Sequence, residues 1–308
     1  MNKVSAYNLL FIFLLFSNSS MAQETRLSFN LEEGEKYILD IDLQQNTHSE
    51  SLNSEEITLS NRMKIEFRVD SILESGVTYM TARYMDLHLS MLAPALSIDI
   101  NSRSGNNQML TQMVKSLERE TFSVVMNSSG ELISVEGMVS MFGALEAIPV
   151  TDTNQQKVIL NTLHEAYGTD SFNSMFSLFV SVYPVVQPIT NWTQDITYYF
   201  NTKPVKMANR YYHIKTTKDE IIIQGLGMLN STKNYLEETG MGEVESSVSG
   251  SQTYDFLMDP QTGWLKRCVS RQRVVIETTI IKSSFLPPGL KIPSYTESVF
   301  EVNGYVSQ

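Results

Sequence analysis

The segment from Thr253 to Leu265 reads TYDFLMDPQTGWL and carries the clearest fold signal in the chain. Polar and apolar residues alternate up to Met258, which is typical of a strand with one buried face. Asp-Pro-Gln-Thr-Gly follows, and these residues favour a tight turn because Pro fixes φ and Gly accepts a positive φ. Trp264 and Leu265 then begin a returning strand. The segment therefore predicts a β-hairpin.

An earlier segment, Thr121 to Leu132, has a similar order, TFSVVMNSSGEL. Both contain a Thr, an aromatic residue, a Met, an Asn or Asp, a turn closed by Gly, and a Leu; the later turn is one residue longer. We predict two hairpins and hypothesise that they anchor two related halves of a sheet. The alternative is that they share only turn chemistry.

Alternation with a period of two runs through much of the chain. Between Ile57 and Leu73, the apolar residues Met63, Ile65, Phe67 and Val69 share one parity, and charged residues occupy the other. One buried apolar face and one solvent-exposed polar face are typical of an open antiparallel sheet. Further strands are expected at 37–43, 77–92, 96–100, 193–200, 210–216, 220–229, 244–258, 264–281 and 295–306.

The period becomes helical at 106–118 and in the middle of the chain, 138–180. The polar stretch 230–242 is expected to be a loop. The order sheet, helix, hairpin, helices, sheet predicts an α+β protein: a large curved antiparallel β-sheet with amphipathic helices packed on one face. Short connections favour a single domain over 23–308, with its two halves at 23–150 and 190–308 around the helical middle.

Residues 1–22 are predicted to be a secretory signal peptide. Lys3 gives a positive start, Leu9 to Phe16 is unbroken and apolar, and small residues precede a cut near Ala22 and Gln23. An uncleaved N-terminal anchor is the alternative, but a span takes about 20 helical residues. We expect a protein exported to the periplasm or the extracellular space, with no transmembrane segment in the mature chain.

Charge and cysteine content narrow the function classes. The net charge of −11 argues against nucleic acid as a partner, because non-specific binding depends on Lys and Arg neutralising phosphates. Cys268 is the single cysteine, so no intrachain disulfide can form. Its expected role is that of a small buried apolar side chain.

The sequence contains no recognisable catalytic or cofactor signature. The four histidines have no metal-ligand spacing, and the serine-nucleophile, phosphate-loop and dinucleotide motifs are absent. Asp40 and Asp42 share a strand face, but two carboxylates are too few to hold a hard cation. We therefore name no catalytic residues, no metal and no cofactor, and lean away from an enzyme.

Methionine and aromatic residues supply the candidate ligand-lining set. The chain has 16 methionines, many of them on apolar faces, and Met suits adaptable apolar binding surfaces. The hypothesis is an apolar cavity between the concave sheet and the helix at 172–180; the alternative is simple gap-filling in the core. The candidate lining residues are Met85, Met91, Met113, Phe172, Met175, Phe176, Phe179 and Trp192.

Three arginines form a second candidate site. Arg267, Arg271 and Arg273 share one parity of a predicted strand, and such a ridge could contact an anionic head group. The alternative is pairing with acidic residues across the hairpin, at Asp255, Glu243 or Glu245.

Several motifs resemble those of a known family. They are Phe29-x-Leu31-x-x-Gly34-x-x-Tyr37, Pro184-Val185-Val186 before Trp192, and the turn at 127–130 before Val135 and Gly137. This set resembles secreted Bacteroidota proteins grouped only as domain of unknown function family 6263, which implies no activity. Thr190-Asn191 before the Trp departs from the usual pattern. The element order also resembles the half-barrel of periplasmic lipoprotein carriers.

The sequence thus does not define a function. The leading hypothesis is a non-enzymatic exported protein that binds an apolar small molecule, a lipid or an envelope protein. The alternatives are a secreted hydrolase with a dispersed site and a structural or surface interaction module.

Overall fold

The computed structural model describes residues 27, 29–50, 56–94, 96–103, 108–146, 153–184, 190–200, 203–231 and 233–307. The predicted signal peptide and its cleavage site lie outside the described residues. Within these ranges, no helix has the length and apolar character needed to cross a membrane.

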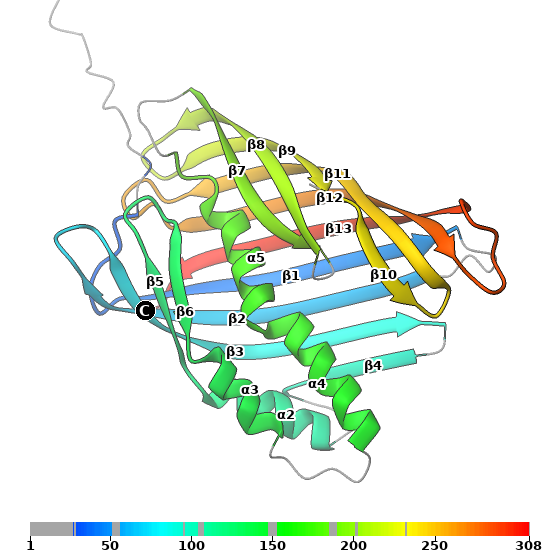
Figure 1. Cartoon of the computed structure of the whole chain (residues 1–308). Coiled ribbons are helices and arrows are strands. Elements are labelled where there is room, and N and C mark those ends of the chain that lie inside the picture. The colour runs from blue at the N-terminus through cyan, green and yellow to red at the C-terminus, as the bar shows by residue number, and fades with distance from the viewer. Residues whose placement is uncertain are drawn as a thin grey trace, which may run out of the picture.

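One antiparallel sheet of 13 strands dominates the molecule (Figure 1). The predicted class, α+β with a large curved antiparallel sheet, is confirmed. The strands are β1 (Lys36–Ser49), β2 (Glu56–Ile72), β3 (Thr78–Ala93), β4 (Leu96–Asn101), β5 (Phe122–Met126), β6 (Leu132–Glu136), β7 (Asn191–Phe200), β8 (Lys203–Thr216), β9 (Ile221–Ser231), β10 (Tyr235–Thr239), β11 (Gly242–Met258), β12 (Leu265–Lys282) and β13 (Lys291–Val306). Strand β10 lies within the polar stretch expected to be a loop, and its backbone pairs with β11.

The strand order places two meanders on either side of β13. The main path is β6-β5-β3-β2-β1-β13-β12-β11-β9-β8-β7, with β4 on β3 and β10 on β11. The hairpins β5–β6 and β11–β12 are each the last pair of their meander in chain order. Related halves would give this arrangement; the duplication and the domain limits stay predictions.

The described part of the chain has four helices beside the sheet: α2 (Gln108–Arg119), α3 (Met138–Glu146), α4 (Thr153–Tyr167) and α5 (Thr169–Val180). Figure 1 shows α5 crossing one face of the curved sheet, in front of β1 and β2. Helix α5 contacts both β6 and β7, the two ends of the strand path. It therefore bridges the two edges of the open sheet.

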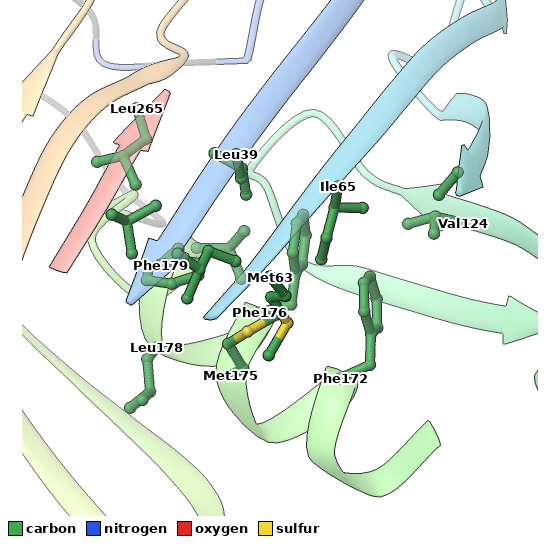
Figure 2. Packing of buried hydrophobic residues seen from close by; sticks show 14 of the residues in the cluster. Leu39, Met63, Ile65, Val124, Phe172, Met175, Phe176, Leu178, Phe179 and Leu265 are labelled. Carbon is green, nitrogen blue, oxygen red and sulfur yellow. The ribbon is translucent and has the colours of Figure 1, made fainter. Parts of the chain in front are cut away.

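Aromatic and sulfur side chains fill the core between α5 and the sheet (Figure 2). The ring of Phe176 lies 5.6 Å from that of Phe67, and the ring of Phe172 lies 5.2 Å from that of Phe122. Met175 of α5 and Met63 of β2, both labelled in the same view, are also buried. The side of the sheet that faces α5 is called the inner face below.

The turns of the two predicted hairpins both contact Tyr183, which follows α5. Its hydroxyl donates to the carbonyl oxygen of Gly263 in the β11–β12 turn. Its ring also lies against Gly130, in the β5–β6 turn, where a Cβ would come within 2.8 Å of the Cδ2 atom. Both turns begin with a side chain that accepts backbone N–H groups, Asn127 in one and Asp259 in the other. Both turns are thus held by the same type of side-chain hydrogen bond.

Candidate functional site

The outer face of the sheet carries paired charges. Asp42 and Arg62 lie 2.7 Å apart across β1 and β2, and Asp40 and Lys64 lie 3.4 Å apart beside them. The two aspartates that share a strand face are therefore neutralised by cations from the next strand. Within the described ranges, no group of three or more His, Cys, Asp and Glu side chains could hold a metal ion.

The predicted arginine ridge lies on this outer face. Arg271 is 4.0 Å from Asp255 across the hairpin, and Arg273 is 3.8 Å from Glu297 of β13. Arg267 is exposed and lies opposite Leu257 and Asn303. Two of the three arginines thus have acidic partners, and an anion-binding role for the ridge stays a prediction.

A shallow depression of about 240 Å³ also opens on the outer face. Two ion pairs lie within its lining: Arg103 is 2.6 Å from Asp86, and Lys64 pairs with Asp40. His88 is 2.9 Å from the exposed Asp99. The full lining is Asp40, Arg62, Met63, Lys64, Asp86, His88, Asn101 and Arg103. The third cation of the lining, Arg62, pairs with Asp42 next to the depression, so each Lys or Arg of the lining already has an acidic partner.

The space between α5 and the sheet is filled. The gap beside Phe176 and Phe179 measures about 10 Å³, at the lower limit for a single water molecule. Five of the candidate lining residues are buried in the hydrophobic core of the protein: Met113, Phe172, Met175, Phe176 and Phe179. Their assignment as ligand-lining residues stays a prediction, and the small gap beside Phe176 and Phe179 is too small to support it.

The other three candidates lie in different surroundings. Met85 is 38% exposed at a β-bulge, where Tyr84 and Asp86 have partners on β2 and Met85 has none. The bulge breaks the expected alternation with Leu87 and places Met85 outside the inner row. Trp192 packs on Tyr211, with ring centroids 5.5 Å apart, and its buried Nε1 has no partner. Met91 lies on the inner face and is partly exposed.

The pairing register places three rows of side chains across the inner face. Phe300 of the first row stacks on Phe179 of α5 at 5.3 Å, which fixes its orientation. The first row is Ile100, Leu89, Asn61, Leu43, Phe300, Ser270, Tyr254, Gly225, Tyr211, Trp192; the second is Ile98, Met91, Leu59, Gln45, Ser298, Gln272, Gln252, Gly227, Asn209, Gln194; the third is Ile57, Thr47, Thr296, Val274, Gly250, Leu229, Met207, Ile196.

At one end of these rows, apolar side chains remain partly exposed. Figure 1 shows that β1, β2 and β3 extend beyond the helices at this end. We call this surface the open strip, and it consists of Leu43, Ile57, Leu59, Met91 and Ile98. Apolar surface that is left accessible on one contiguous face is a common mark of a binding site.

The middle of the second row is polar and buried. Gln272 Nε2 donates to Gln252 Oε1 at 2.9 Å, and Gln252 donates to Ser270. The Oδ1 atom of Asn209 accepts from Tyr254, but its Nδ2 atom is buried without a partner. These amides and hydroxyls follow directly from the apolar strip along the same row. The inner face therefore changes from apolar to polar without acquiring charge.

Glu118 of α2 lies beside a break in the pairing of β3. Strand β3 pairs with β5 at one end and with β4 at the other, and the bulge at Met85 lies between. The N–H of Ser102 donates to the carbonyl of Leu87 in this gap. Burial raises the pKa of the Glu118 carboxyl, with Ser102 and the backbone of Leu87 acting in the opposite direction, and its Oε1 atom is buried without a hydrogen-bond partner. The raised pKa favours the protonated form of this carboxyl, and its neighbours Leu87 and Ser102 are not members of the open strip.

Residues 75–265 match the family of unknown function DUF6263, more than half of the chain. The chain belongs to the DUF6263 family. This confirms the family resemblance found in the sequence, and the family carries no assigned activity. No curated protein sequence matches the chain.

Two solved structures illustrate the structural similarities of this DUF6263 protein. Lipovitellin, solved in a study of its lipid–protein interactions, has 12% identity to this chain and a TM-score of 0.49 over 90% of it. The chain spans 26% of the length of lipovitellin. An outer membrane channel of Pseudomonas putida F1 has 7% identity and a TM-score of 0.20, over 90% of this chain and 97% of the channel. At these scores, neither likeness bears on the function.

Sequence reasoning missed most of the open strip of the DUF6263 chain. Met91 was the single member that it singled out, because methionine was the signal used. In the sequence, Leu59 and Ile98 are apolar residues of predicted strands, with nothing that marks them as a site. The sequence does hold one signal for this face. Gln45 and Thr47 follow Leu39, Ile41 and Leu43 at every second position of β1, and both are polar but uncharged.

Proposed function

We propose that this protein is a non-enzymatic binding protein that holds an apolar or lipid-like ligand on the open strip. The observation that carries the proposal is the partial exposure of Leu59, Met91 and Ile98, three apolar neighbours in one row of the inner face. The proposed site therefore differs from the filled space under α5. The protein acts after export, in line with the predicted signal peptide.

The residues around the open strip favour its coverage by a ligand over its exposure to solvent. Leu43, Leu59 and Ile98 pack at the margin of the main core, so a ligand lying on them would extend that core. Covering apolar surface is worth about 25 cal/mol per Å², so a chain of several methylene groups gains appreciable affinity.

Binding of the uncharged fluorophore N-phenyl-1-naphthylamine tests the proposal. We expect the wild-type protein to bind it, and Met91→Gln and Leu59→Gln to bind about tenfold more weakly, because an amide that contacts an apolar ligand pays for lost hydration. Met228→Gln is the matched control, since Met228 is 58% exposed on the outer face.

The outcomes are distinct. Equal binding by all four proteins would place the fluorophore elsewhere and contradict the proposed site. No binding by the wild-type protein would contradict the function itself.

A further inference from the structure

Uncharged side chains make up the three described rows of the inner face around the open strip. None of the described residues in its three rows is Asp, Glu, Lys, Arg or His. The opposite parity of the same strands carries the ion pairs of Asp40, Asp42 and Glu66. A charged ligand group brought to the inner face would lose hydration and gain no counter-ion there, which disfavours it strongly.

A buried hydrogen-bond acceptor lies at the border of the open strip. Asn61 of β2 is 4% exposed and lies between Leu43 of β1 and Leu89 of β3 in the first row. Its Oδ1 atom is buried and has no hydrogen-bond partner. A buried acceptor without a partner is costly, and a donor supplied by a ligand would remove that cost.

A second amide lies next to Asn61. Gln45 is two residues beyond Leu43 on β1, and thus the diagonal neighbour of Asn61 on the same face. Gln45 is partly exposed, and its Nε2 lies 3.5 Å from Thr47 Oγ1. Together the two residues offer amide groups, one of them with an unused acceptor, at the border of the apolar strip.

We infer that the ligand of the open strip is an uncharged amphiphile. Its apolar chain lies along Leu59, Met91 and Ile98, and an O–H or N–H of its head donates to Oδ1 of Asn61. This inference rests on the proposed function and names the ligand class that the same site takes. A carboxylate or an ammonium head would meet neither a counter-ion nor, in the case of the carboxylate, a donor at Oδ1.

Displacement of N-phenyl-1-naphthylamine by three ligands with the same chain tests the inference. The ligands are dodecanol, dodecanoate and dodecyltrimethylammonium, each used below its aggregation threshold at pH 8. We expect dodecanol to displace the fluorophore at about a tenfold lower concentration than either ion, a difference of one good hydrogen bond. We expect Asn61→Leu to abolish this preference while it keeps its affinity for the fluorophore.

Asn303→Leu on the exposed outer face is the matched control and keeps the preference. If Asn61→Leu does not fold, the wild-type comparison of the three ligands decides alone. Equal displacement by the alcohol and either ion overturns the inference and leaves the proposed function standing. A wild-type protein that binds neither the fluorophore nor any of the three ligands overturns both.

Discussion

The hydroxyl of Tyr183 donates a hydrogen bond to the carbonyl oxygen of Gly263, and both residues are buried. The bond joins the segment after α5 to the β11–β12 turn. The same tyrosine ring lies against Gly130 of the β5–β6 turn. One side chain thus holds together two hairpins that are far apart in the chain.

Removing the Tyr183 hydroxyl should destabilise the fold. Tyr183→Phe leaves a buried carbonyl oxygen without this donor, which costs about 1–3 kcal/mol. Urea denaturation measures the loss, and Tyr79→Phe is the control because Tyr79 is 40% exposed. Equal midpoints for the two variants would show that the bond adds nothing to stability.

Gly130 should tolerate alanine less well than Gly34 does. Both have a positive φ, +78° and +83°, so each Gly→Ala change carries a backbone cost of about 1–2 kcal/mol. A Cβ on Gly130 would also meet the rings of Tyr183 and Phe29, whereas one on Gly34 has nothing within 4 Å. Gly130→Ala should therefore lose a further 1–2 kcal/mol or so through overpacking. The difference between the two losses of melting temperature, each measured against the wild type, isolates this packing cost. Equal losses would show that the packing cost is absent.

Asp259 should make stability depend on acidity. Burial raises the pKa of its carboxyl, but bonds from the N–H groups of Thr262 and Gln261, the Thr262 hydroxyl and nearby Lys266 together lower it below its usual range. The stabilisation is present above the unfolded pKa of about 3.9 and is lost as pH falls through the lower folded pKa. Asp259→Asn should thus be less stable than the wild type at pH 7, by about 1 kcal/mol, and the gap should close in acid. Urea midpoints from pH 2 to pH 7 test this; a gap that stays constant with pH would rule out the ionised carboxylate as its source.

Glu118 should change stability with pH in the opposite direction from Asp259. Because burial raises its pKa, the protonated form is favoured in the folded state. Its contribution is present below the unfolded pKa of about 4.3 and is lost as pH rises through the folded pKa. Glu118→Gln should therefore be more stable than the wild type at pH 7, and its advantage should shrink towards pH 4. Melting temperatures across this range provide the measurement, with Glu136→Gln as an exposed control. A variant less stable at pH 7 would mean that the ionised carboxylate makes bonds worth more than its burial costs.

Local chemistry made much of the fold predictable. The Asp259 and Asn127 turns, the parity of Met63 to Val69 and the helical period of α2 are all readable from short stretches. The pairing of β1 with β13 is not, because nothing local specifies a partner so distant in the chain. The bulge at Met85 and the short strand β10 escaped notice for the same reason: both depend on neighbouring strands.

The candidate site was predicted less well. Phe172 and Phe176 were grouped with Met91 because a sequence pattern cannot distinguish an apolar face that packs against protein from one left open. The helices bury the first two and leave Met91 partly exposed. For the arginines, the cross-strand alternative includes Asp255, which lies 4.0 Å from Arg271, because hairpin register can be inferred from a short stretch.

The position of β13 between the two meanders has a consequence for biosynthesis. Strand β13 is made after the other twelve strands, yet it is the element that joins β1 to β12. Two meanders can form from local contacts as the chain emerges, but their union waits for Lys291 to Val306. Until then, β1 and β12 each present an unpaired edge, and such edges template aggregation. A chain lacking 291–308 should thus sediment as aggregates, and a soluble monomer would contradict this order of assembly.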